Sequence, residues 1–268
     1  MPFFEHAGLR FHYLDSGPGL PVVLQHGLGA NVHQPEELYR PQPGFRFLAV
    51  DVRDHGETQP LSDPARLTFD TLADDLGALL DHLGIERAVI GGVSLGAGIA
   101  LNFTLRYPAR VRALVLSRPA WLDQPYPENL HGLVSAAHYL RKYGAADGLA
   151  RFQASDDYAA VLRQSADSAN SLVKQFNDPR AAEAVDRLER IPADAPNCDR
   201  AAWAAIRVPT LVLTTQRDLI HPHAYGVVLA EAIPGAVRYE LTPQSVSREQ
   251  YQADTQARLT GFLNQHFA

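Results

Sequence analysis

Short runs of apolar residues alternate along the first part of the chain with longer stretches of helical periodicity. Runs without polar interruption are typical of strands buried on both faces of a sheet. Apolar residues that recur every three or four positions instead indicate a helix with one buried face. These runs predict strands at Pro21–Gln25, Phe45–Val50, Ala88–Val93 and Val111–Ser117, helices at Thr68–Leu83 and Leu95–Tyr107, and an N-terminal hairpin of Phe3–Glu5 and Leu9–Leu14. The alternation of strand and helix predicts an α/β fold with a mostly parallel sheet.

Residues 118–207 break this alternation. The stretch is rich in alanine, contains six prolines and lacks the pattern of a buried strand. We therefore expect it to form several helices inserted as a lid into a core made of residues 1–117 and 208–268. The core pattern resumes with strands at Pro209–Thr214 and Val237–Leu241, a helix at about Tyr225–Ala232 between them, and a last helix from near Glu249 to Phe267.

Composition and charge exclude several classes of protein. The chain has 268 residues, of which 46% are hydrophobic and 20% charged, as in an ordinary globular domain. Its 24 basic and 30 acidic residues form no long basic tract, so nucleic acid is not an expected partner. No run reaches about 18 apolar residues and the N-terminus lacks the apolar core of a signal peptide, so no membrane partner is expected. The single cysteine, Cys198, excludes an internal disulfide. We expect a cytoplasmic protein, and a homodimer remains open.

The sharpest chemical signal is the sequence Gly92-Val93-Ser94-Leu95-Gly96, between a predicted strand and a predicted helix. Small residues two positions before and after the serine permit a tight, strained turn that exposes the hydroxyl at the end of the strand. This context predicts that Ser94 is a nucleophile.

With these motifs the sequence resembles the α/β-hydrolase family over nearly its whole length. Gln25–Gly29 is similar to the H-G-x-G loop of that family, and Asp51–Thr58 to its D-x-R-G-x-G-x-S segment, with Asp54 and Thr58 in place of glycine and serine. The resemblance implies a mostly parallel eight-stranded sheet with helices on both faces and an inserted helical lid. It also implies that the backbone N–H groups of Leu28 and Leu95 form an oxyanion hole.

The resemblance also identifies the acid of a catalytic triad. In the family, an aspartate at the end of the seventh strand is followed four residues later by proline, and here Asp218 precedes Pro222 in this way. A carboxylate there would hold a catalytic histidine in the correct tautomer. We therefore predict that Asp218 orients the base.

The base itself is missing from its usual place. In the family a histidine follows the eighth strand, but residues 241–250 contain none. A serine hydroxyl needs a base within about 2.6–3.2 Å, so another histidine has to supply it. We predict that His221 or His223 does so from the loop that carries Asp218. An alternative is that His131 or His138, two helical turns apart in the predicted lid, reaches the site.

The remaining expectations concern the ligand. Aromatic residues of the lid, with Trp121 first among them, are expected to line the pocket for a small apolar or aromatic carbonyl substrate. His221-Pro222-His223 offers too few ligands for a metal, and no G-x-G-x-x-G is in register for a dinucleotide, so no cofactor is expected. We therefore predict a hydrolase of esters, thioesters, lactones or similar carbonyl compounds. The alternative is a lyase or a ligand receptor of the same fold, in which Ser94 is not a nucleophile.

Overall fold

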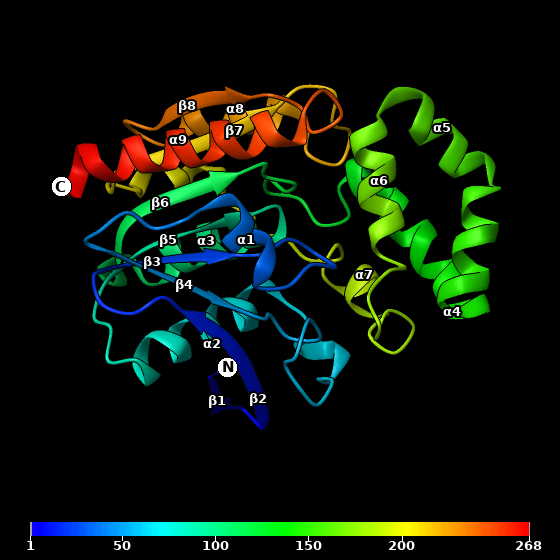
Figure 1. The fold of residues 1–268 in the computed structure, drawn as a ribbon, viewed down its shortest axis with the longest axis horizontal. Helices are drawn as coiled ribbons and strands as arrows, with labels where there is room; N and C mark the ends of the chain where they lie inside the picture. The colour runs from blue at the N-terminus through cyan, green and yellow to red at the C-terminus, as the bar shows by residue number, and fades with distance from the viewer. Residues whose placement is uncertain (1, 268) are drawn as a thin grey trace.

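A single eight-stranded sheet forms the centre of the computed structural model, which describes residues 2–267 (Figure 1). Its strands are β1 (Phe3–His6), β2 (Leu9–Asp15), β3 (Leu20–Gln25), β4 (Phe45–Val50), β5 (Ala88–Val93), β6 (Val111–Ser117), β7 (Thr210–Thr215) and β8 (Val237–Leu241). They lie in the order β1-β2-β4-β3-β5-β6-β7-β8. β1 and β2 pair with each other and β2 with β4 in antiparallel fashion, and the remaining pairs are parallel. The predicted α/β fold with a mostly parallel sheet is confirmed.

Helices cover both faces of the sheet, which explains why its central strands are apolar throughout. α1 (His33–Leu38) and α9 (Arg248–Phe267) pack on one face, and α2 (Phe69–His82), α3 (Leu95–Arg106) and α8 (His223–Ala232) on the other. All six residues of β5 are buried. The predicted helices are present with shifts of one or two residues at their ends. The apolar pattern did not predict α1, because a helix of six residues is too short to show a helical period.

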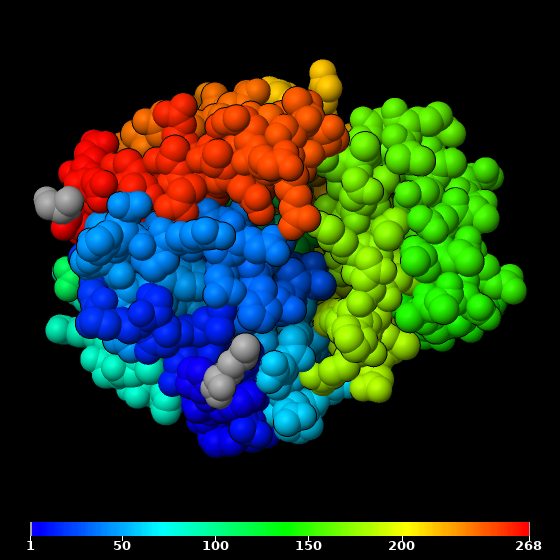
Figure 2. Space-filling view, in the orientation of Figure 1, coloured from blue at the N-terminus to red at the C-terminus, as the bar shows by residue number. Residues whose placement is uncertain are grey.

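The chain between β6 and β7 is helical. It contains α4 (His131–Gln153), α5 (Asp156–Gln164), α6 (Ala166–Lys174) and α7 (Arg187–Arg190), with short 3₁₀ turns at Glu128–Leu130 and Arg200–Ala205. We call residues 118–207 the helical insertion. α4 is interrupted at Gly144, which has φ 73° and ψ −172°. The insertion projects beyond one end of the sheet, at the right of Figures 1 and 2. The core assigned to residues 1–117 and 208–268 surrounds it in sequence, and its outermost residues, 1 and 268, lie outside the described residues.

Buried polar contacts attach the insertion to loops of the core. Arg187 donates a hydrogen bond of 2.6 Å to the carbonyl oxygen of Asp54, and Gln175 donates one of 3.1 Å to that of Leu28. These bonds satisfy backbone carbonyls that would otherwise be buried without partners. The insertion is therefore held directly above the loop after β3, next to Ser94. No helix among the described residues has the length and apolar character needed to cross a bilayer.

Candidate functional site

Ser94 occupies a strained turn between β5 and α3. Its backbone has φ 58° and ψ −112°, which a residue with a side chain rarely adopts. Two glycines make this turn possible, because a Cβ atom on Gly92 would collide with the backbone of Gly96, and one on Gly96 with the carbonyl group of Gln25 in β3. The turn therefore packs tightly against the end of β3 and lifts the Ser94 hydroxyl above the sheet.

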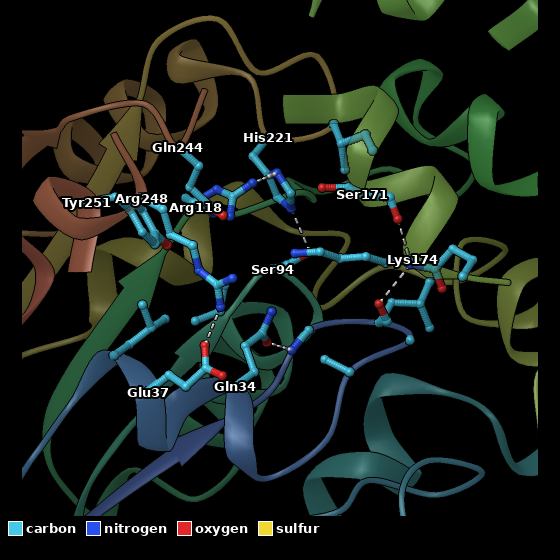
Figure 3. Close-up of a pocket in the computed structure, with 18 of the residues that line it drawn as sticks. Gln34, Glu37, Ser94, Arg118, Ser171, Lys174, His221, Gln244, Arg248 and Tyr251 are labelled. Carbon is cyan, nitrogen blue, oxygen red and sulfur yellow. Dashed lines mark hydrogen bonds and ion pairs between the residues drawn. The ribbon is translucent and has the colours of Figure 1, made fainter. Parts of the chain in front are cut away.

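A histidine lies within hydrogen-bond reach of this hydroxyl. His221 Nε2 is 2.9 Å from Ser94 Oγ, and His221 Nδ1 is 2.9 Å from Asp218 Oδ2. The imidazole and the carboxylate are almost fully buried, with 6% of His221 and 7% of Asp218 exposed. Serine, imidazole and carboxylate thus form a continuous chain in which one imidazole nitrogen faces each oxygen. Figure 3 shows Ser94 and His221 of this chain.

Acid and imidazole both come from the loop after β7. β6 separates β7 from β5, so two strand spacings of about 4.8 Å lie between the loop and Ser94. The loop turns back toward Ser94 because the backbone N–H of His221 donates to Asp218 Oδ1 at 3.2 Å. Ser168 of α6 stabilises the same turn: its hydroxyl oxygen accepts the N–H of Leu219 at 2.8 Å and lies 3.1 Å from Asp218 Oδ1. The helical insertion therefore helps to hold the acid in place.

Arg118, the first residue after β6, lies beside the imidazole. Its Nη2 is 2.6 Å from Asp218 Oδ2 and 3.0 Å from His221 Nδ1. Burial alone would raise the pKa of Asp218, but the charges of His221 and Arg118 and their hydrogen bonds hold that pKa well below its usual range. Burial lowers the pKa of His221, and Arg118 lowers it further against the opposing effect of Asp218. The site thus favours an ionised carboxylate beside a neutral imidazole.

The two residues predicted for the oxyanion hole are Leu28, in the loop after β3, and Leu95, which follows Ser94. Leu95 is the first residue of α3, whose first N–H groups lack acceptors within the helix. Leu28 lines the cavity in front of Ser94, and Gln175 fixes its peptide through the carbonyl oxygen. Gly27 N–H donates to Gln34 Oε1 at 2.6 Å, which further orders this loop.

The cavity in front of Ser94 has a volume of about 110 Å³, and its lining is polar and apolar in about equal parts. It lies where the loop after β3, the helical insertion and the start of α9 meet (Figures 2 and 3). The lining side chains that can carry a charge are Glu37, Arg118, Lys174, His221 and Arg248. Gln244 lines the cavity from the loop after β8, where the family resemblance would place a histidine. Tyr251 is the one aromatic residue other than His221 in the described lining.

Four of the residues predicted for the site lie elsewhere, and the first of them is His223. It begins α8 and faces away, with Nε2 3.0 Å from Arg238 Nη1 and 3.3 Å from Glu240 Oε2. Its position two residues after His221, beyond Pro222, reverses the direction of its side chain. His223 is therefore not the base in this arrangement.

The predictions for Trp121, His131 and His138 are also wrong in position. Trp121 is 2% exposed and packs edge-on against Phe69, with ring centroids 5.3 Å apart, so it belongs to the hydrophobic core. His131 and His138 share the solvent-facing side of α4 and are exposed, and neither lines the cavity. The seven-residue spacing did place them on one face of the helix. The buried apolar residues of α4 lie on the opposite face.

Two departures from the family motif have simple structural explanations. Asp54 stands where the resemblance has glycine and adopts φ 60°, while its Oδ1 accepts the N–H of Ser62 at 2.8 Å. Thr58 replaces serine, and its hydroxyl donates to the carbonyl oxygen of Asp51 at 2.7 Å. Within residues 2–267, no three His, Cys, Asp or Glu side chains are grouped in a way that could hold a metal ion.

Comparison with known proteins agrees with this architecture. The sequence model of the alpha/beta hydrolase fold family matches residues 21–245. The 2-hydroxymuconate semialdehyde hydrolase of Pseudomonas sp. (strain CF600) is 31% identical over 239 residues, 86% of this chain and 81% of that protein. The crystal structure of the enol-lactonase from Burkholderia xenovorans LB400 is 26% identical, with a TM-score of 0.72 over 98% of this chain and 100% of that one. A thermophilic esterase from Thermogutta terrifontis is 25% identical, with a TM-score of 0.74 over 99% of this chain and 97% of that one.

Proposed function

We propose, from the premise that the chain belongs to the α/β-hydrolase fold family, that it is a serine-dependent hydrolase of small carbonyl compounds. The observation that carries this proposal is the position of His221, whose two nitrogens each lie 2.9 Å from an oxygen, one of Ser94 and one of Asp218. A serine hydroxyl becomes an effective nucleophile when such a base can accept its proton.

In the proposed reaction, Ser94 Oγ attacks the substrate carbonyl carbon while His221 Nε2 takes the hydroxyl proton. The N–H groups of Leu28 and Leu95 stabilise the negative charge that develops on the carbonyl oxygen. The imidazolium then donates its proton to the leaving oxygen, which departs and leaves an acyl group on Ser94. Water, deprotonated by His221, attacks this ester in the same way and restores the serine. Asp218 stabilises the imidazolium through Nδ1 in both halves of the reaction.

The names of similar proteins support esters and lactones as substrates. The relatives with comparable length are called a semialdehyde hydrolase, an enol-lactonase and an esterase. Two of these names, the enol-lactonase and the esterase, name a lactone or an ester as the bond that is cleaved. We propose an ester, thioester or lactone with a compact acyl group, because the cavity of about 110 Å³ is below the range of about 300–1,000 Å³ of pockets for larger ligands. The helical insertion would act as a lid that excludes water from this cavity.

The test is hydrolysis of short p-nitrophenyl esters by the purified protein and by Ser94→Ala and His221→Ala. Removal of the nucleophile or the base should lower kcat on the order of 10⁴-fold or more. His223→Ala is a matched control, because it removes an imidazole two residues away that contacts Arg238 and Glu240 instead. It should retain most of the activity. Equal rates for the wild type and Ser94→Ala would rule out acyl-enzyme chemistry and favour a receptor of the same fold.

A further inference from the structure

The charged groups around the Ser94 cavity do not balance. Arg118 pairs with Asp218 at 2.6 Å, and Arg248 pairs with Glu37 at 2.7 Å. The third cation of the lining, Lys174, has no carboxylate oxygen within 4.0 Å of its ammonium group anywhere in residues 2–267. The lining therefore carries one positive charge without a paired negative charge.

Lys174 is the last residue of α6, and Figure 3 shows its side chain extending from this helix into the cavity. A lysine at the C-terminus of a helix is favourable for the helix itself, because it faces the negative end of the helix dipole. That effect does not require the ammonium group to point into the cavity that contains Ser94. The direction of the side chain therefore suggests a second role.

The electrostatic surroundings of Lys174 point the same way. Partial burial and then the positive charges of Arg248 and Arg118 lower the pKa of its ammonium group. The carboxylates of Glu37 and Asp167 raise this pKa and offset the lowering only in part. Three cations thus repel one another around one cavity. An anion bound beside Lys174 would relieve this repulsion, because an opposite charge nearby favours the charged form of the ammonium group.

We infer that the substrate of the Ser94 site carries a carboxylate, bound by Lys174. This inference rests on the proposed function and adds the chemical class of the substrate. It replaces the expected apolar or aromatic acyl group with an acidic one. A singly charged carboxylate fits better than a phosphate dianion, because one uncompensated charge is available. Ser171 also lines the cavity beside Lys174, and its hydroxyl donates to the carbonyl oxygen of Asp167 at 3.0 Å.

The experiment compares two esters of matched shape, monomethyl succinate and methyl isocaproate, in which an isopropyl group replaces the carboxylate. Hydrolysis is followed by proton release with wild type, Lys174→Gln and Lys142→Gln. Lys142 is the only other lysine of the chain, lies exposed on α4 and does not line the cavity. Its substitution therefore removes the same charge at a position away from the site. The wild type and Lys142→Gln should prefer the anionic ester in kcat/KM by about tenfold. Lys174→Gln should lose this preference, and about 1 M salt should weaken it in the wild type.

Binding of monomethyl succinate to Ser94→Ala, measured by titration calorimetry, separates this inference from the proposed function. If no ester is hydrolysed but the Ser94→Ala protein binds the anionic ester and Ser94→Ala/Lys174→Gln does not, the proposed reaction fails and the carboxylate site stands. If the esters are hydrolysed without preference, or Lys174→Gln slows both equally, the carboxylate site is refuted and the hydrolase stands. If the Ser94→Ala protein binds the anionic ester no better with Lys174 than without it, the inference is overturned.

Discussion

At the scale of single residues, Arg118 and Asp218 compete for the same imidazole nitrogen of the candidate triad. Arg118 lies 3.0 Å from the same imidazole nitrogen that faces Asp218, so a His221 tautomer with unprotonated Nδ1 could accept from Arg118. That tautomer would carry its proton on Nε2 and could not deprotonate Ser94. An ionised carboxylate can only accept a hydrogen bond. The bond to Asp218 therefore selects the tautomer that carries its proton on Nδ1 and leaves Nε2 free to accept the proton of Ser94.

The pH profile of the esterase activity tests this balance. The pKa of His221 lies below its ordinary value of 6.5, so the imidazole should stay neutral, and kcat/KM should stay high, to a pH below that value. Arg118→Gln removes a positive charge that lowers this pKa. The acid limb of the profile should therefore move to higher pH, whereas Arg118→Lys, which keeps the charge, should leave it near the wild-type position. A limb that stays in place or moves down in Arg118→Gln would contradict this assignment.

The residues of the site differ in how far the sequence could determine them. Ser94 and Asp218 were predicted from motifs with a fixed local spacing. In the structure they lie on opposite sides of the His221 imidazole. The choice between His221 and His223 could not be made, because it depends on the direction in which the loop turns after Asp218. One hydrogen bond from the His221 N–H and the proline that follows decide that direction. Lys174 was missed because a single lysine at a helix end carries no motif.

At the scale of elements, the sheet and its covering helices could be predicted, because their apolar periods extend over several residues. The glycines at positions 92 and 96 of the β5–α3 turn were also informative, because each one lies where two backbone segments approach closely. The parts of the helical insertion could not be predicted in detail. α4, its longest helix, is interrupted at Gly144, and several polar residues of the insertion, such as Ser168 and Gln175, are buried through contacts with the core.

Gly96→Ala tests the role of the turn. The added Cβ would overlap with the carbonyl group of Gln25, which is backbone and cannot move aside as a flexible side chain would. We expect a loss of about 1–3 kcal/mol in the free energy of unfolding and, because Ser94 would be displaced, a loss of activity on the order of 10²-fold. Urea denaturation and kcat/KM measure the two effects.

Gly261→Ala is the control for this substitution. Gly261 lies in α9, and no atom outside its own helix backbone and chain neighbours comes within 4 Å of the place that an added Cβ would take. Alanine should therefore stabilise the helix by up to about 1 kcal/mol without affecting activity. Full activity in Gly96→Ala would show that the turn tolerates a wider spacing than the contacts indicate.

At the scale of the whole molecule, the helical insertion and the sheet share one hydrophobic core. Leu133 and Phe152 of α4 and Leu172 of α6 belong to the same cluster of buried side chains as Phe69 of α2 and Ile99 of α3. The triad lies at this boundary, since Ser168 of the insertion contacts Asp218 of the core. An insertion bound in this way should unfold together with the sheet.

Arg187 offers the clearest test of that coupling. Its side chain is 1% exposed and bridges the insertion and the core, pairing with Asp178 at 2.7 Å and with the carbonyl oxygen of Asp54 at 2.6 Å. Arg187→Met should cost about 3–5 kcal/mol in the free energy of unfolding, because it leaves both acceptors without their buried partner. Arg141→Met removes an arginine of the same insertion that pairs with Asp186 and Glu189 but is 48% exposed, and it should cost no more than about 1 kcal/mol.

Urea denaturation followed by circular dichroism and by the fluorescence of Trp121 and Trp203 distinguishes a shared transition from separate ones. Trp203 is fully buried in the 3₁₀ turn at the end of the insertion, and Trp121 packs against α2, so the two tryptophans report the boundary while circular dichroism reports the whole chain. For a single cooperative unit both signals should change together, and Arg187→Met should shift them equally. Loss of the fluorescence signal at lower urea than the circular dichroism signal would mean that the insertion opens by itself, and that the buried arginine serves only a local contact.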